Sequence, residues 1–103
     1  RKVVYTGDTK PFEQFAQFAA GADIIIHEAT FDDELAEKAA LDGHSTPSQA
    51  ALQAKAANAN KLVLTHISAR YVDTLLLEVQ AKKNFPSTIV ASDFLELELP
   101  LSE

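Results

Sequence analysis

The three histidines of this chain are the residues best suited to metal or proton chemistry. Each lies in a short polar motif: His27-Glu28-Ala29-Thr30, Gly43-His44-Ser45-Thr46 and Thr65-His66-Ile67-Ser68. A neutral imidazole is a common zinc ligand, and its unperturbed pKa lies close to neutral pH. Because the chain contains no cysteine, any zinc here would have to be held by histidine and carboxylate groups.

Three candidate residues, Asp8, Glu28 and His66, come at or just after the ends of predicted strands. The apolar segments that predict these strands are residues 2–5, 23–27 and 61–65. The carboxyl ends of strands in an open α/β sheet form the edge where ligands bind. We therefore expect these three side chains to converge, although an isolated aspartate in a Thr-Gly-Asp turn is more often a turn or capping residue.

Helical patterns separate the predicted strands. Pro11 suits a first helical position, and the helix that follows should stop at Gly21. A second helix is expected over about residues 32–41, and Thr46 as N-cap with Pro47 at the first helical position should begin an alanine-rich third helix. Val72, Leu75, Leu76 and Val79 repeat at helical spacing, which predicts a fourth helix that ends before Asn84-Phe85-Pro86.

Two further strands are predicted near the C-terminus. Residues 88–91 form a short apolar segment, and residues 95–99 alternate strictly between leucine and glutamate. Strands that alternate with helices along a chain are typical of βαβ units, so we predict an α/β fold.

Length and charge restrict the classes of function. The 103 residues, 47% of them hydrophobic, suffice for one domain or half-domain with a modest core. The net charge of −6 argues against this chain being the main surface that grips an RNA backbone. No run approaches the roughly 20 apolar residues that cross a bilayer, so we expect no membrane association, and the lack of cysteine favours the cytoplasm.

Together with Tyr5-Thr6-Gly7-Asp8-Thr9, the three histidine motifs resemble in order and spacing the C-terminal half of ribonuclease Z. That family consists of metallo-β-lactamase-fold endonucleases that cut the 3′ trailer from precursor tRNA. The resemblance spans almost the whole chain. It implies that residues 1–103 are the C-terminal half of an αββα sandwich, with one mixed sheet and helices packed mainly on one face.

The resemblance also implies roles for four residues. The aspartate that matches Asp8 bridges two metal ions, and the histidine that matches His66 binds one of them. Glu28 and His44 match a catalytic pair that handles protons near the departing ribose oxygen. Two divalent ions are therefore implied, with zinc favoured and manganese as the alternative, and precursor tRNA is the implied substrate.

Four other residues have weaker assignments. Arg70 and Tyr71 would contact RNA phosphate or a flipped-out base, although Arg70 would equally suit a salt bridge that supports the His66 loop. Asp93 would orient a metal-bound histidine, with a simple turn carboxylate as the alternative. His27 ends an isoleucine-rich strand, so we favour a structural role and keep a direct role as the minor alternative.

The HxHxDH motif and one further histidine, which supply most of the family's metal ligands, do not occur in this sequence. We therefore expect the chain to be a fragment that is catalytically inactive and at best a weak metal binder by itself. An uncovered sheet edge would favour a homodimer. The alternatives are another hydrolase of the same fold and a non-catalytic interaction subunit that retains only this half.

Overall fold

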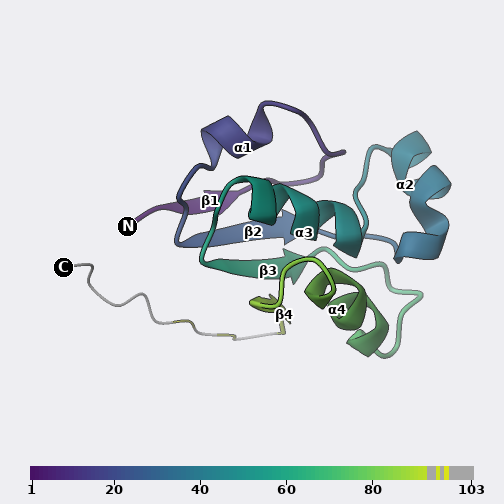
Figure 1. Ribbon diagram of the computed structural model, residues 1–103. Coiled ribbons are helices and arrows are strands. Elements are labelled where there is room, and N and C mark those ends of the chain that lie inside the picture. Colours follow the sequence, from purple (N-terminus) through teal and green to yellow (C-terminus); the bar gives the residue numbers. More distant parts are fainter. Residues whose placement is uncertain (93–94, 96, 98–103) are drawn as a thin grey trace.

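The computed structural model describes residues 1–92, 95 and 97 (Figure 1). A four-stranded sheet is built from β1 (Val3–Tyr5), β2 (Ile24–Glu28), β3 (Lys61–Thr65) and β4 (Thr88–Val90). The strands lie side by side in chain order. All four strands predicted over residues 2–5, 23–27, 61–65 and 88–91 are confirmed within one or two residues.

Every described strand pair is parallel, whereas we expected a mixed sheet. The reason is that a helix lies between each strand and the next, which returns the chain to the same end of the sheet before the next strand begins. The strand predicted over residues 95–99 lies largely outside the described residues. The α/β class is confirmed.

The helices are α1 (Phe15–Phe18), α2 (Ala36–Asp42), α3 (Pro47–Ala56) and α4 (Leu75–Lys82), and the 3₁₀ turn η1 (Asp33–Leu35) precedes α2. In Figure 1, α1, α3 and α4 cover the same face of the sheet, while α2 lies beyond the strand tips. The expectation of helices mainly on one face is therefore confirmed. Among the described residues, no helix has the length and apolar character needed to cross a membrane.

The core lies between the sheet and its helices. The strands contribute Val4, Ile25, Leu62 and Leu64 to this cluster. Three alanines of α3 pack against them, and each is fully buried: Ala50, Ala51 and Ala54. Their small side chains let the helix lie close to the sheet, which fixes the position of the loop before α3.

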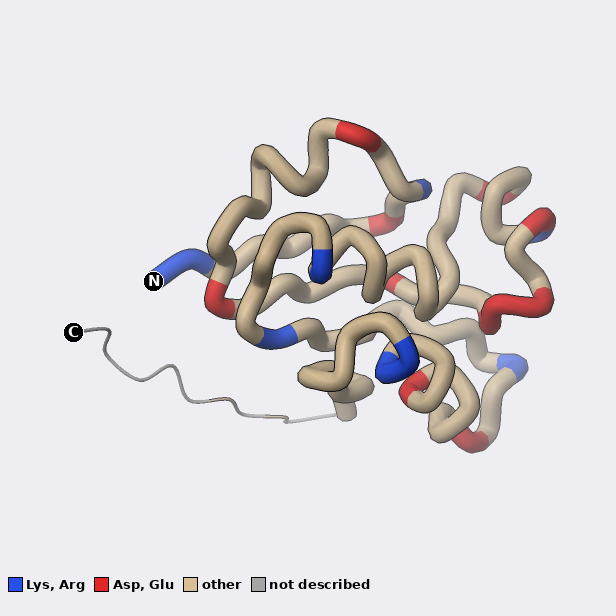
Figure 2. Tube along the Cα trace, in the orientation of Figure 1, with Lys and Arg blue, Asp and Glu red and all other residues tan. Residues whose placement is uncertain are grey.

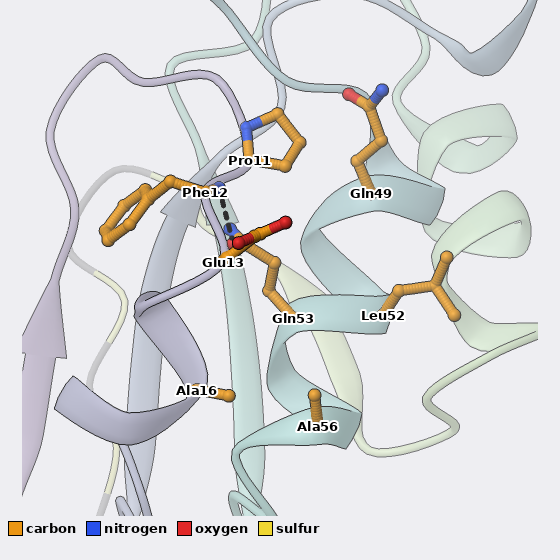
Figure 3. A pocket seen from close by; sticks show the side chains of 8 residues that line it. All are labelled: Pro11, Phe12, Glu13, Ala16, Gln49, Leu52, Gln53 and Ala56. Carbon is orange, nitrogen blue, oxygen red and sulfur yellow. Dashed lines mark hydrogen bonds between the residues drawn. The ribbon is translucent and has the colours of Figure 1, made fainter.

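The first helix begins later than the sequence pattern predicted. We expected Pro11 at the first helical position, but α1 begins at Phe15 and is only 4 residues long. The backbone N–H of Phe12 donates instead to the Gln53 side chain on α3, at 3.1 Å. This contact is drawn in Figure 3, where residues 11–16 and α3 form the two sides of a groove. A tertiary hydrogen bond thus replaces the first helical turn.

The predicted fourth helix is confirmed as α4, but most of the residues whose spacing indicated it are not the ones it buries. Val72 lies outside the helix and is fully exposed, and the side chains of Leu75, Leu76 and Val79 are about half exposed. The buried side chains of α4 are those of Leu77, Gln80 and Ala81. Gln80 accepts a hydrogen bond from the Asp33 backbone at 2.9 Å, and this contact with η1 fixes the rotation of α4.

The N-terminus of α3 has the predicted cap. Thr46 accepts a hydrogen bond from the Gln49 backbone at 3.3 Å, and the Gln49 side chain accepts one from the Thr46 backbone at 2.9 Å. This reciprocal pair is a capping box, and Pro47 occupies the first helical position.

We expect Thr46→Ala to lower the free energy of unfolding by about 1 kcal/mol, because the Gln49 N–H loses its acceptor. Thr46→Ser keeps the hydroxyl and should retain most of that stability. Urea denaturation of the two variants measures the difference. Equal unfolding midpoints would contradict the capping role.

Candidate metal and catalytic site

Four side chains with suitable chemistry meet at the carboxyl edge of the sheet. Asp8 follows β1, Glu28 is the last residue of β2 and His66 follows β3. Because the three strands are parallel, their ends come together as predicted. His44 arrives from the loop between α2 and α3, where Gly43 adopts a left-handed φ of 77° and reverses the chain after α2.

Asp8, His44 and His66 form a cluster that could hold a metal ion. One ligand atom from each residue lies within 4.8 Å of the other two. His66 Nε2 lies 3.4 Å from Asp8 Oδ1, and the His44 and His66 rings stack with centroids 5.6 Å apart. Two imidazoles and a carboxylate suit zinc, but they are fewer donors than a dinuclear site requires.

The backbone of His66 supports a specialised role for this residue. Its φ angle is +54°, in the left-handed region that residues other than glycine seldom adopt. Such strain persists only where surrounding contacts enforce it, and it is concentrated at functional sites. Here the following loop is fixed by a hydrogen bond of 2.9 Å from the Ser68 N–H to the Thr30 carbonyl.

Glu28 is a buried carboxylate with both oxygens hydrogen-bonded. Its side chain is 1% exposed. Oε2 accepts from the backbone N–H and the hydroxyl of Thr30, at 2.9 and 2.7 Å. Oε1 accepts from the Ser45 N–H at 2.6 Å and from the Thr9 N–H at 3.4 Å. Glu28 therefore connects the loops after β1 and β2 with the loop before α3.

His44 is oriented by the same carboxylate. Its Nδ1 lies 3.3 Å from Glu28 Oε1 and 3.1 Å from the Thr30 hydroxyl oxygen. Since the Thr30 hydroxyl donates its proton to Glu28, both neighbours of Nδ1 act as acceptors, which assigns the Nδ1–H tautomer. The Nε2 atom remains as the ring nitrogen for a substrate or a metal ion.

Sequence reasoning did not predict that Thr9 and Ser45 take part in this network. Thr9 contributes only backbone groups, since its N–H donates to Glu28 and its carbonyl accepts from the Ser45 hydroxyl at 2.6 Å. Backbone donors leave no signal in residue identity. The position of Ser45 directly after His44 was the one available clue.

Comparison with known proteins identifies the family. Residues 1–67, which contain all three histidines, match the family model described as "Beta-lactamase superfamily domain". The chain belongs to this superfamily. Its metallo-β-lactamase fold, predicted from the motifs, is confirmed, and membership supports the use of divalent metal ions.

Relatives in the superfamily also confirm the resemblance to ribonuclease Z. The chain is 50% identical over its whole length to ribonuclease Z of Archaeoglobus fulgidus, and 45% identical over 97% of its length to that of Bacillus subtilis. It covers 34% and 33% of those proteins, so it spans about a third of the relatives it matches.

Solved structures agree with this similarity. The human tRNase Z short form superposes with a TM-score of 0.79 at 36% identity, over 98% of this chain and 34% of that one. A long-form RNase Z from yeast gives a TM-score of 0.76 at 33% identity, over 88% of this chain and 12% of that one.

His27 lies in the core of this superfamily domain. Its ring is fully buried, with Nδ1 2.8 Å from the Glu28 carbonyl and Nε2 2.6 Å from the Gln53 amide nitrogen. The carbonyl requires a donor at Nδ1, and Nε2 then accepts from Gln53. Both nitrogens are used within the core, which leaves neither for the cluster of Asp8, His44 and His66.

Burial lowers the pKa of His27 below its usual value of 6.5, despite opposing contributions from Glu28. The unfolded chain binds this proton more readily than the folded one. The stability that depends on a neutral His27 ring is therefore fully present above about pH 6.5 and falls as the pH drops toward the folded pKa. We expect an NMR titration of the ring protons to give a midpoint below 6.5. A midpoint at or above 6.5 would contradict a buried neutral ring.

Arg70 and Tyr71 occupy different environments. The Tyr71 hydroxyl donates to the Asp32 carboxylate at 2.8 Å and accepts from the Asp32 N–H at 2.7 Å. Burial raises the pKa of this hydroxyl. The two hydrogen bonds tie the loop after β3 to the loop after β2. The exposed Arg70 guanidinium lies over the Phe31 ring, 5.3 Å from its centroid. Asp93, predicted to orient a metal-bound histidine, lies outside the described residues.

Proposed function

We propose that this chain forms part of a metal-dependent endoribonuclease that removes the 3′ trailer from precursor tRNA and leaves a 3′-hydroxyl. The observation that carries the proposal is the pairing of His44 with buried Glu28 directly beside Asp8 and His66. Similarity to ribonuclease Z at up to 50% identity supports the choice of substrate.

Asp8 and His66 would hold divalent metal ions in the complete enzyme. We propose two ions, with zinc favoured because the donors are imidazole and carboxylate groups, and manganese as the alternative. When bound, such ions supply an activated water and stabilise negative charge on the phosphate. We propose that residues 1–103 provide only part of this ligand set, so the isolated chain is inactive and binds metal weakly.

His44 would act on the leaving oxygen. Glu28 and Thr30 fix its Nδ1–H, so the proton that a cationic ring can give away is the one on Nε2. As the oxygen of a deprotonated water bonds to phosphorus and the bond to the 3′ oxygen breaks, His44 Nε2 would protonate that 3′ oxygen, and the phosphate would remain on the trailer. Glu28, buried and hydrogen-bonded on both oxygens, contributes by orienting His44.

Other parts of the prediction also remain proposals. The homodimer is supported by the position of β1 as an outer strand of the described sheet and by its exposed Val3 and Tyr5, at 52% and 70%. A light-scattering mass of one chain at high concentration would count against it. We propose the cytoplasm as the location because the chain lacks cysteine.

Cleavage and metal content together test the proposal. The complete protein should cut precursor tRNA and contain two ions per chain, and Asp8→Ala should lower the metal content. Bound metal without tRNA cleavage would favour another hydrolase of the superfamily. Absence of bound metal would favour the non-catalytic interaction subunit.

A further inference from the structure

Phe31 brings two cations and a histidine together beside the site. Its ring is buried, at 7% exposure. Lys38 Nζ on α2 and Arg70 Cζ in the loop after β3 each lie 5.3 Å from the ring centroid. The same ring meets His44 edge-on, with centroids 6.1 Å apart and an interplanar angle of 81°. Three separate segments thus place two cations and an imidazole around one aromatic side chain.

The surroundings make this arrangement unexpected. The chain carries a net charge of −6, and Figure 2 shows that η1 and α2 are rich in acidic positions. An aromatic face attracts a cation only weakly at an exposed site, and two cations near one ring repel each other. An anion bound between or beside them would offset that repulsion.

Both cations remain available for a ligand. Lys38 pairs with Asp42 at 3.2 Å, but both side chains are nearly half exposed, so water weakens the pair. In the part of the chain that the structure describes, no carboxylate lies within ion-pair distance of the Arg70 guanidinium. The salt bridge considered for Arg70 is therefore not formed with a described residue.

The Arg70 loop is held firmly in place. Ser68 N–H donates to the Thr30 carbonyl at 2.9 Å, and the Tyr71 hydroxyl is bonded twice to Asp32. Ser68 and Tyr71 flank Arg70 in sequence. Their partners, Thr30 and Asp32, flank Phe31 in sequence. These bonds fix the loop that carries Arg70, and a planar guanidinium suits recognition of a phosphate.

We infer that Phe31 is a positioning residue that holds Lys38 and Arg70 beside His44, where the two cations bind a backbone phosphate of the RNA next to the scissile one. The inference rests on the proposed function and extends it to a second phosphate. Three observations support it: Lys38 and Arg70 share the Phe31 ring, this ring contacts His44 edge-on, and the loop that carries Arg70 is fixed.

The test compares Lys38→Gln with Lys82→Gln in the complete protein. Lys82 is a matched control, because it too is 46% exposed and pairs with an acidic residue one helical turn away, Glu78 at 3.8 Å. The probe is a precursor tRNA with a single-stranded 3′ trailer, and KM, kcat and binding are measured at several salt concentrations.

Lys38→Gln should raise KM roughly threefold to tenfold with little change in kcat, and it should reduce the salt slope of binding by about 0.7. Arg70→Gln should act similarly, and Phe31→Leu should reproduce the loss while Phe31→Tyr restores binding. Lys82→Gln should behave as wild type.

Two outcomes distinguish failure of this inference from failure of the proposed function. If wild-type protein cleaves the precursor but the Lys38 and Lys82 variants have the same KM and salt slope, the second phosphate site is overturned and the function stands. If the wild-type protein neither binds nor cleaves precursor tRNA, the proposed function is overturned together with this inference.

Discussion

Replacement of His44 by asparagine in the complete enzyme is expected to slow precursor tRNA cleavage by about 10²- to 10⁴-fold, the usual contribution of a general acid. An asparagine amide can reach Glu28 and Thr30 from the place of Nδ1, but it has no atom equivalent to Nε2. The substitution therefore removes the proton donor and keeps the hydrogen bonds that organise the loop. Single-turnover kinetics measures the effect on the chemical step.

Metal content distinguishes the two roles open to His44. The ring lies within the same cluster as Asp8 and His66, so it could serve as a ligand instead of an acid. We expect His44→Asn to retain its metal, whereas His66→Asn should lose metal and activity together. Loss of metal from the His44 variant would contradict the proton-transfer role and assign His44 as a ligand.

Replacement of Glu28 by alanine is expected to lower the free energy of unfolding by roughly 3–5 kcal/mol, because buried and partly buried donors lose their acceptor. These donors are the N–H groups of Thr9, Thr30 and Ser45, the Thr30 hydroxyl and the Nδ1–H of His44. Cleavage should fall as well, since His44 would no longer be oriented.

Glu28→Gln and Glu37→Ala are the controls for this prediction. Gln keeps one acceptor oxygen and the side-chain volume, so it should retain part of the stability. Glu37 is exposed on α2, and its replacement should change the unfolding free energy by less than about 0.5 kcal/mol. Urea denaturation compares the three variants. A Glu28→Ala protein as stable as the Glu37→Ala protein would show that the buried carboxylate is not a structural connection.

Local sequence patterns predicted most of the fold. The isoleucine run at 24–26 and the Leu-Val-Leu run at 62–64 are buried strands, and the Thr46-Pro47 pair does begin a helix. In each case the signal lies within a few residues and needs no knowledge of distant contacts. The convergence of Asp8, Glu28 and His66 followed from a general rule about the ends of parallel strands.

Errors occurred where distant residues decide the local structure. Residues 72–81 contain enough apolar side chains to form more than one helical face, and the bond between Gln80 and Asp33 selects the buried one. The start of α1 depends on the side chain of Gln53 from another helix. The hydrogen bonds that fix Glu28 come largely from backbone groups, which no residue type specifies.

The most direct test of the central claim is to map the product ends after the complete protein has acted on a precursor tRNA with a 3′ trailer. We predict one cut just after the discriminator base that leaves a 3′-hydroxyl, and loss of that product in the His66→Ala variant. An unaltered precursor, or the same product from wild type and His66→Ala, would contradict the assignment of this site to tRNA 3′ processing.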